Sequence, residues 1–446
     1  VESVRIVYNA VAAKVVDPTR ELDLQIQQVL SYRVAGAEQS DLYQSGAWDG
    51  RSSFYEMRHH RFPAGFVPIV KQALTKMGYK VSLRRAPLPK PMGAERPRFD
   101  DHGYTDDRYS YQPETVDRLV RHGSMIAQVA TGGGKSRIAQ IATARICRPT
   151  LFLTTRSVLM YQMRDHYVNM LRGLDKNYPE DFARHSVGVL GDGDWNPRQW
   201  INVGMVQTLA ARLKKPSPLD SKEKQAAAEK RITETKRILE RFEFVILEEA
   251  HEASGFSYYE IMKRCKNANY RLALTATPFM KDDEEANMNL MACSGPIGIR
   301  VSEEKLIDSG ILAKPYFKYL KPERPHHMTR GTSWGAAYRL GIVESESRNR
   351  LIMQQAILAS NSELSVLILV QQKKHGKLLE AAFLKNSIKT KFIFGETSGD
   401  IRGAALKALT DGRIQVLIGS NILDIAVEVP ALGMVILAAG GQAEVA

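Results

Sequence analysis

Long apolar runs and closely spaced pairs of cysteines are missing from this chain of 446 residues. No stretch approaches the roughly 18 consecutive apolar residues that cross a bilayer. Glu2 and Arg5 stand where a signal peptide needs an apolar run. Cys147, Cys265 and Cys293 lack the short spacing of a zinc site, and their odd number argues against a disulfide scaffold. We therefore expect a cytoplasmic protein, not bound to membranes, whose cysteines are reduced and lie in the core.

Positive charge is what the chain has in excess. The 62 Lys and Arg residues outnumber the 49 Asp and Glu residues and give a net charge of +13. The positive electrostatic field of such a protein attracts polyanions and is typical of proteins that bind nucleic acid, although charge alone does not identify the binding partner. An apolar content of 44% is that of a folded protein. The length predicts about three domains.

The first hundred residues contain no nucleotide-binding motif and form the first predicted domain, residues 1–100. An alternating run at 3–16 indicates a strand, and residues 67–77 indicate a helix that stops at Gly78. A small α+β domain is expected. Residues 86–98 are rich in proline and charge and read as a linker, so we place the boundary near Asp100.

From Tyr104 onward, short β-branched apolar runs alternate with helical segments, which predicts parallel sheets with helices on both faces. The expected strands are 151–155, 201–206, 244–247 and 271–274, then 366–370, 391–394, 415–418 and 434–438. We expect two similar α/β lobes in series, residues 101–314 and 315–446. The charged segment 221–241 is expected to be a protruding helix with a solvated face.

A glycine-rich loop at 130–136, Ala-Thr-Gly-Gly-Gly-Lys-Ser, lies between an apolar run and a helical pattern. Strand, loop and helix in this order form a phosphate cradle, because the backbone amides and the helix N-terminus face the anion. Lys135 is expected to reach the β and γ phosphates, and Ser136 to hold Mg²⁺. The predicted ATP-binding residues of this loop are Thr131, Gly132, Gly133, Gly134, Lys135 and Ser136.

Two adjacent carboxylates, Glu248 and Glu249, follow the expected strand 244–247. The carboxyl ends of such strands are where open α/β sheets bind ligands. Mg²⁺ prefers oxygen ligands, and an attacking water needs a base. We assign Glu248 to the metal and Glu249 to the water, so the chain is expected to hydrolyse ATP.

The glycine loop and the Glu-Glu-Ala-His segment at 248–251 together resemble the motifs of superfamily 2 helicases, from about Tyr104 to the end. The resemblance implies two RecA-like lobes, adds His251 to the catalytic residues and makes Gln112 the adenine-sensing residue. Glu248 departs from the usual Asp of this box. Thr275 and Thr277 resemble the family motif that couples ATP binding and hydrolysis to the binding of DNA. The alternative interpretation is that these two threonines only cap a turn after the strand.

Later motifs carry the same resemblance into the nucleic-acid contacts and the second lobe. The implied DNA-binding residues are Thr155, Arg156, Gln207, Thr208, Gln371 and Ser420. Asp424 and Glu428 are implied to couple the lobes, although Ala426 and Glu428 stand where the family often has Gly and Asp. An arginine-containing motif is expected shortly after Val445, so we expect the protein to continue and name no arginine finger.

The N-terminal segments 45–51 and 61–65 resemble the first domain of bacteriophage branched-DNA helicases of the UvsW type. This extends the resemblance to nearly the whole chain. It implies fork regression and Holliday-junction branch migration in phage replication, recombination or repair, by a monomer in the host cytoplasm. Trp48 and Arg51 are candidate DNA contacts; for Trp48, a core position beside a hairpin turn is the alternative.

Other functions fit parts of this pattern. Within the enzyme class, the alternative is the motor subunit of a restriction system or an RNA helicase; a nuclease or methyltransferase domain would mark the former, and the sequence shows neither. The binding-class alternative is a fork-binding protein that uses ATP only as a conformational switch. Turnover that no DNA stimulates would favour that alternative.

Overall fold

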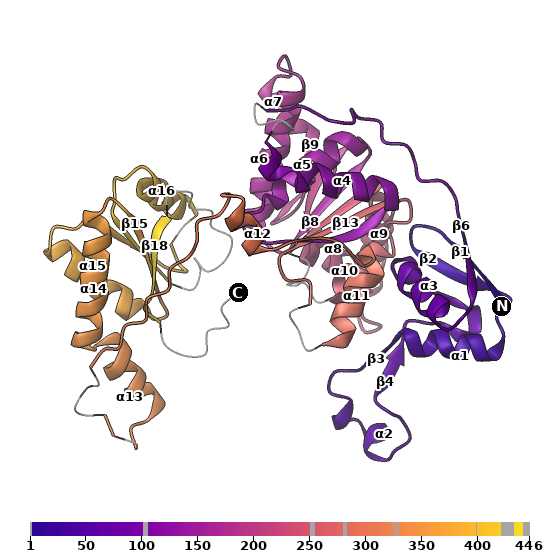
Figure 1. Ribbon diagram of the computed structural model, residues 1–446, viewed down its shortest axis with the longest axis horizontal. Helices are drawn as coiled ribbons and strands as arrows, with labels where there is room; N and C mark the ends of the chain where they lie inside the picture. Colours follow the sequence, from indigo (N-terminus) through magenta and orange to yellow (C-terminus); the bar gives the residue numbers. More distant parts are fainter. Residues whose placement is uncertain are drawn as a thin grey trace. The chain divides into compact units, whose positions relative to one another are not determined.

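The structure, a computed structural model, describes residues 2–100, 106–249, 255–279, 283–323, 325, 328–329, 331–397, 399–420 and 432–439. The chain divides into two compact units, Val1–Lys314 and Pro315–Ala446, each with sheets and cores of its own (Figure 1). Both units contain a largely parallel sheet with packed helices, which confirms the predicted α/β class. No helix in these ranges has the length and apolarity needed to span a membrane.

The N-terminal part of the first unit is built on a four-stranded sheet with the order β5-β2-β1-β6. The strands are β1 (Ser3–Tyr8), β2 (Ala12–Val16), β5 (Arg61–Pro63) and β6 (Lys80–Arg85), with a separate ribbon of β3 (Ser31–Arg33) and β4 (Arg51–Ser53). The helices are α1 (Arg20–Val29), α2 (Asp41–Gln44) and α3 (Val67–Lys76). The run expected as one strand at 3–16 is an antiparallel hairpin, in which Tyr8 lies opposite Ala13.

This N-terminal part packs against helix α11 (Glu284–Ser294) of the first lobe. A Cβ atom added to Gly65 would lie 2.1 Å from the carbonyl oxygen of Met291, so only a glycine permits this backbone approach. The ring of Phe54 meets that of Tyr259 edge-on, with centroids 5.7 Å apart. The N-terminal residues and the first lobe therefore form one compact unit.

Residues 86–98 run along the first lobe (Figure 1) and are bound to it. The Met92 amide donates to the carbonyl of Ile146 at 3.1 Å. The Tyr270 hydroxyl donates to the carbonyl of Pro89 at 2.5 Å. The segment predicted to be a linker is held along the lobe as a strap, because proline keeps it extended and its remaining polar groups find partners on the lobe.

The first lobe contains an eight-stranded sheet with the order β10-β9-β11-β8-β12-β13-β7-β14. Its strands are β7 (Ser124–Val129), β8 (Thr150–Thr154), β9 (Val187–Gly191), β10 (Asp194–Asn196), β11 (Ile201–Met205), β12 (Phe244–Glu248), β13 (Tyr270–Thr275) and β14 (Ile297–Val301). Neighbours are parallel except for β10 with β9. The four strands expected in this lobe are confirmed as β8, β11, β12 and β13, each within one residue at either end.

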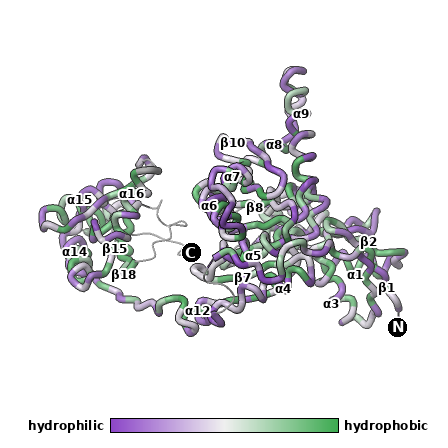
Figure 2. The backbone as a smooth tube through the Cα atoms, turned by 90° about the horizontal axis from the view of Figure 1, so that it is seen from above, coloured by the Kyte–Doolittle hydropathy of each residue, from purple (hydrophilic) through white to green (hydrophobic). Residues whose placement is uncertain are grey.

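Helices cover both faces of this sheet, as expected for a doubly wound lobe. One face carries α4 (Tyr111–His122), α5 (Lys135–Ile146), α6 (Ser157–Leu174), α7 (Glu180–Ser186) and α12 (Glu303–Asp308). The other carries α8 (Val206–Leu213), α9 (Lys222–Leu239), α10 (Gly255–Met262) and α11. Figure 2 shows α9 extending away from the lobe, which confirms the protruding helix expected at 221–241.

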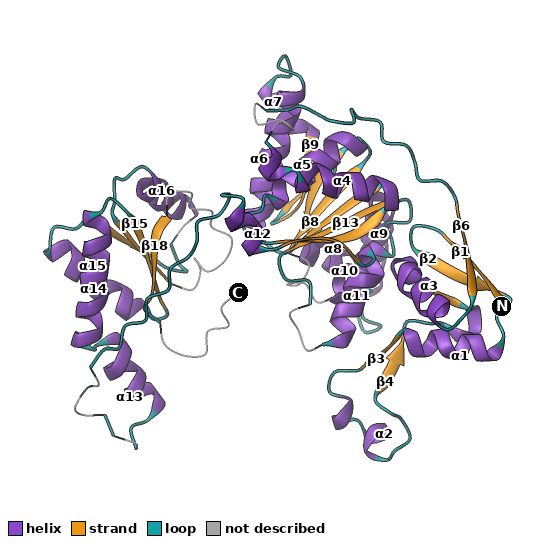
Figure 3. Cartoon of the chain, viewed as in Figure 1, coloured by secondary structure: helices purple, strands orange, loops and turns teal. Residues whose placement is uncertain are grey.

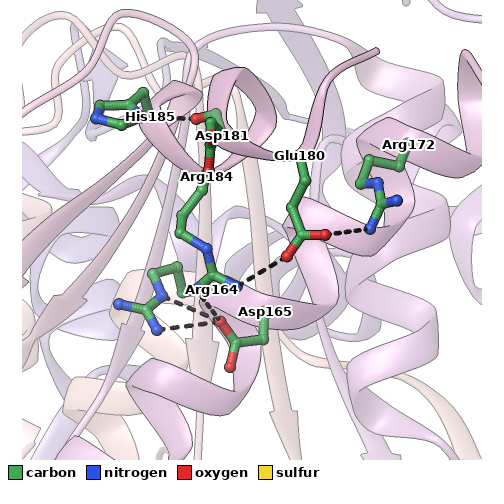
Figure 4. A network of polar contacts seen from close by, with 7 residues as sticks. All are labelled: Arg164, Asp165, Arg172, Glu180, Asp181, Arg184 and His185. Carbon is green, nitrogen blue, oxygen red and sulfur yellow. Dashed lines mark hydrogen bonds and ion pairs between the residues drawn. The ribbon is translucent and has the colours of Figure 1, made fainter. Parts of the chain in front are cut away.

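A network of arginines and carboxylates fastens α7 to α6 (Figure 4). Arg184 lies 3.3 Å from Asp165 of α6 and 3.5 Å from Glu180 of its own helix. Glu180 also pairs with Arg172 at 2.9 Å. The basic side chains of this surface are therefore neutralised within the protein.

The second unit is a smaller parallel sheet with the order β16-β17-β15-β18 (Figure 3). Its strands are β15 (Ser365–Val370), β16 (Thr390–Ile393), β17 (Val416–Ser420) and β18 (Leu432–Leu437). Its helices are α13 (Trp334–Tyr338), α14 (Glu346–Asn361), α15 (Lys373–Lys385) and α16 (Gly399–Thr410). All four strands fall where the apolar runs predict them.

The cysteines divide into two kinds. Cys265 and Cys293 are buried, and burial raises the pKa of each thiol to about 12. Cys147 is exposed directly after α5, with a φ of +47°. The expectation of a core thiol is wrong for Cys147, because the helix ends at this residue and the chain turns at the surface.

Candidate functional site

The glycine loop connects β7 to α5 and can be made only by glycines. Gly132 and Gly134 adopt left-handed backbone conformations, with φ of +80° and +75°. A Cβ atom on Gly132 would lie 2.6 Å from Leu312, and one on Gly134 would lie 2.5 Å from the Nε2 atom of Gln112. The loop therefore forms a cradle at the N-terminus of α5, where an anion is favoured.

The start of α4 clamps this loop. The buried Tyr111 hydroxyl donates to the carbonyl oxygen of Gly133 at 2.6 Å, and the amide of Gln112 approaches the same oxygen at 3.4 Å. Burial raises the pKa of Tyr111, which keeps the hydroxyl a donor. The adenine-sensing role of Gln112 stays a prediction, while the hydroxyl of Tyr111 is a contact that the sequence did not reveal.

Strand β12 delivers the two neighbouring carboxylates to this cradle. Lys135 and Glu249 form an ion pair with an Nζ–Oε1 distance of 2.5 Å. Their side chains are only 10% and 20% exposed, so the pair is largely shielded from water. Glu249 has a φ of +47°, and its amide donates to the carbonyl of Leu274 on β13 at 3.1 Å. The structure thus joins two motifs that lie far apart in the sequence.

Glu248, the last residue of β12, is 5% exposed. Burial raises its pKa to about 7, and the neighbouring charge of Glu249 adds to the shift while Lys135 opposes it. A bound cation would relieve this unfavourable burial of negative charge. Within the described ranges, no group of three or more His, Cys, Asp or Glu side chains is arranged to hold a metal. The few protein oxygens fit Mg²⁺, which is usually completed by water and substrate phosphates.

The expected coupling motif lies at the end of β13, between β12 and β7. Thr275 is fully buried, and its hydroxyl accepts from the amide of Thr277 at 3.2 Å. The side-chain amide of Gln128, on β7, donates to the carbonyl of Ala276 at 3.3 Å. The capped turn of the alternative interpretation is present, and the coupling role stays a prediction.

Two predicted nucleic-acid motifs of the first lobe meet at the ends of neighbouring strands. Thr155 and Arg156 follow β8, while Gln207 and Thr208 follow β11, which pairs with β8. The side-chain amide of Gln207 donates to the carbonyl of Thr155 at 2.8 Å. The structure therefore forms one surface from residues that the sequence presents separately.

Trp48 and Arg51 lie beside each other in the β3–β4 ribbon region. The Trp48 indole donates to the carbonyl of Arg51 at 2.7 Å, and Trp48 is half-buried. Arg51 also approaches Glu284 of α11, with a nitrogen–oxygen distance of 3.5 Å. The ribbon is thus tied to the first lobe.

In the second unit, Gln371 and Ser420 end up at the carboxyl ends of the paired strands β15 and β17. The Tyr338 hydroxyl donates to the side-chain oxygen of Gln371 at 2.8 Å. His251, Asp424 and Glu428, which the sequence also singles out, lie outside the described residues. Their positions are therefore left as predictions.

With this geometry established, comparison with known proteins defines the class. Residues 107–280 match the family described as "Type III restriction enzyme, res subunit", and residues 349–440 match the "Helicase conserved C-terminal domain". Both matches lie on the two parallel-sheet lobes, so the chain carries two helicase-type domains in tandem, as superfamily 2 helicases do.

The solved structures that it resembles include UvsW of bacteriophage T4. One T4 UvsW crystal structure matches with a TM-score of 0.51 at 16% identity, covering 99% of this chain and 84% of that one. A second, of the UvsW helicase, matches with a TM-score of 0.51 at 17% identity, covering 67% of this chain and 99% of that one. At these identities the likeness shows the fold.

A viral relative matches more weakly. The predicted helicase 22 of Sulfolobus islandicus filamentous virus (isolate Iceland/Hveragerdi) is 23% identical over 222 residues. The match covers 47% of this chain and 39% of the viral protein. The aligned region thus spans well under half of that relative.

Proposed function

We propose that this chain is an ATP-dependent DNA translocase that remodels branched DNA, such as forks and four-way junctions. The observation that carries the motor function is the meeting of Lys135 with Glu249 beside the glycine cradle. The branched substrate is supported by the likeness to UvsW, which extends over the N-terminal part as well as the lobes.

In the proposed reaction, Lys135 leaves its carboxylate partner and contacts the β and γ phosphates of ATP. Ser136 and Glu248 would hold Mg²⁺, which when bound neutralises charge on the phosphates. Glu249, released from Lys135, accepts a proton from the attacking water. Thr131 and the three glycines of the cradle, Gly132, Gly133 and Gly134, orient their amides toward the phosphates. Gln112 and His251 complete the proposed nucleotide site.

Coupling to DNA would start from Thr275 and Thr277, because β13 lies between the strands that carry the cradle and the carboxylates. Thr155, Arg156, Gln207 and Thr208 would hold the DNA backbone in the first lobe. Gln371 and Ser420 would do so in the second, where Asp424 and Glu428 are proposed coupling residues. Such contacts fix position without reading sequence.

The test is the ATPase rate measured with single-stranded, duplex, forked and four-way-junction DNA and with RNA. Branched DNA is expected to stimulate hydrolysis most and to be converted to migrated products. Stimulation by RNA alone would indicate an RNA helicase. Turnover that no nucleic acid stimulates would indicate the ATP-switched binding protein and refute a translocase.

A restriction-type motor is the second candidate, because the first-lobe family match carries that description. This candidate predicts movement along unbranched duplex DNA. ATPase activity that rises with the length of an unbranched duplex, with no added effect of a fork, would favour it over the branched-DNA proposal.

A further inference from the structure

An open groove of about 730 Å³ lies between the loop that follows α8 and the protruding helix α9. Its charged lining residues are Lys214, Lys215, Asp220, Lys224 and Arg231. The cations outnumber the carboxylates by four to one in this lining. The segment around it, residues 212–241, contains ten Lys and Arg against five Asp and Glu. The groove is therefore a concentrated site of positive charge.

The groove cations keep their charge exposed. Lys214, Lys215 and Lys224 are exposed and have no carboxylate partner among the residues that the structure describes. Arg231 is held by two carbonyl oxygens, those of Arg212 and Lys214, each at 3.4 Å, which position the guanidinium without neutralising it. The positive field is thus available to an external anion.

The one carboxylate of the lining is already engaged, since Asp220 accepts from the amide of Ser217 at 2.8 Å. Helix α9 turns Lys224, Ala227, Ala228 and Arg231 toward the groove, positions that share one face of a helix. The two alanines leave room between the two cations. The other charged residues of the α9 turns that border the groove, including Glu223 and Glu229, lie off this face.

Other arginines of the first lobe, unlike the groove cations, are paired with carboxylates or packed on an aromatic ring. Arg212 pairs with Glu234 at 2.9 Å and lies 3.6 Å above the ring centroid of Trp195. The arginines of the α6–α7 network are likewise paired with carboxylates (Figure 4). Packing and internal ion pairs account for the positions of those arginines. Within the described part of the chain, the groove lysines have neither kind of contact to account for them.

The groove continues from a predicted DNA contact. Helix α8 begins directly after β11 with Gln207 and Thr208 in its first turn, and it ends next to Lys214. Eight residues of helix span about 12 Å, or about four base pairs of duplex at 3.4 Å each. A nucleic acid that contacts the start of α8 therefore needs to extend only a few nucleotides to reach the groove.

We propose that this groove binds the phosphate backbone of the DNA substrate, at a site beyond the helicase motifs. The proposal rests on the DNA translocase function proposed above. Lysines and a fixed arginine suit phosphate oxygens, and contacts of this kind add affinity without sequence preference. The groove would thereby hold a stretch of duplex while the motif residues act on the strand.

The test compares the wild-type chain with the triple variant Lys214→Ala, Lys215→Ala, Lys224→Ala. Binding of a fork with a 30-base-pair arm is measured over a range of salt concentrations. Each lost phosphate contact lowers the slope of log K against log salt by about 0.9, so a fall of about two to three is expected.

The control is the double variant Arg121→Ala, Lys266→Ala, at exposed residues that precede β7 and β13 at the opposite edge of the sheet from the proposed contacts. It removes two positive charges against three in the test, and Lys266, unlike the groove lysines, is paired with Glu240 at 2.7 Å. It should leave the slope within one unit of wild type. ATP hydrolysis without DNA should be the same in all three proteins, and circular dichroism checks their folding. The single variant Lys224→Glu, on the exposed part of α9, serves if the triple variant does not fold.

An unchanged salt slope in the folded variants, while wild type binds and is stimulated by DNA, would overturn the groove proposal alone. Failure of the wild-type chain to bind any nucleic acid would overturn both proposals. Equal loss of affinity in the Arg121 and Lys266 control would show that net charge, rather than the groove, is responsible, and would also refute the site.

Discussion

Replacing Glu248 with glutamine should stabilise the ligand-free first lobe, and increasingly so at high pH. The folded protein raises the pKa of this carboxyl from 4.5 to about 7, mainly by burial. The folded state therefore favours the protonated form. The contribution of Glu248 to stability is present below about pH 4.5 and is lost as pH rises through about 7. A shift of this size corresponds to about 3 kcal/mol.

Glutamine keeps the size and hydrogen-bonding capacity of the protonated acid but does not ionise. The variant should unfold like wild type near pH 4, below the unfolded pKa, and should be more stable by about 3 kcal/mol above pH 8. Guanidinium unfolding reports this difference through tryptophan fluorescence in a Trp334→Phe background, where the remaining tryptophans, Trp48, Trp195 and Trp200, all lie in the first unit.

Glu229→Gln is the control, because Glu229 is exposed on α9. The difference in free energy of unfolding between this variant and wild type should not change with pH. The same small difference for Glu248→Gln at pH 4 and pH 8.5 would refute the reasoning. It would mean that Glu248 is ionised at little cost, through solvent access or a charge partner in the folded lobe. If Glu248→Gln were less stable than wild type at high pH, the change in free energy of unfolding would have the opposite sign, and the reasoning would be refuted more strongly.

Lys135→Ala should abolish DNA-stimulated ATP hydrolysis and leave DNA binding largely intact; retention of more than a tenth of the wild-type rate would contradict the cradle assignment. Glu249→Gln should bind ATP with Mg²⁺ but stall at hydrolysis, whereas Glu248→Asp should stay active, and single-turnover assays would expose a reversed pattern. Gly134→Ala should weaken nucleotide binding by about five- to thirtyfold, since its φ of +75° costs about 1–2 kcal/mol with a side chain; unchanged binding of a fluorescent ATP analogue would contradict this. Trp48→Ala should reduce fork preference while ATPase stimulated by plain single-stranded DNA persists, and equal junction processing would rule out its DNA role.

Removing residues 1–100 is a poor way to test the N-terminal part. The packing of Phe54 on Tyr259 and the close approach of Gly65 to Met291 make this part continuous with the lobe core. Truncation would expose that apolar surface and risk unfolding the lobe. Point substitutions in the β3–β4 ribbon keep the interface and are the better choice.

The features that sequence alone determined are those governed by local pattern. Alternation of β-branched runs with helical segments was enough to place four of the eight strands of the first lobe and the four described strands of the second. The glycine loop was recognisable because left-handed backbone at Gly132 and Gly134 excludes most other residues. Carboxylates after an apolar strand indicated the second half of the site, because parallel strands present their carboxyl ends at one edge.

Contacts between distant parts of the chain were decided only by the tertiary structure. The ion pair of Lys135 with Glu249 and the clamp of Tyr111 on Gly133 depend on which strands become neighbours. The proline-rich segment 86–98 has the composition of a linker, yet it is bound along the lobe because its polar backbone groups find partners there. The groove at Lys224 likewise exists only because α8 and α9 pack together and turn one helix face inward. Local sequence sets the elements, whereas burial and long-range packing select the pairings among them.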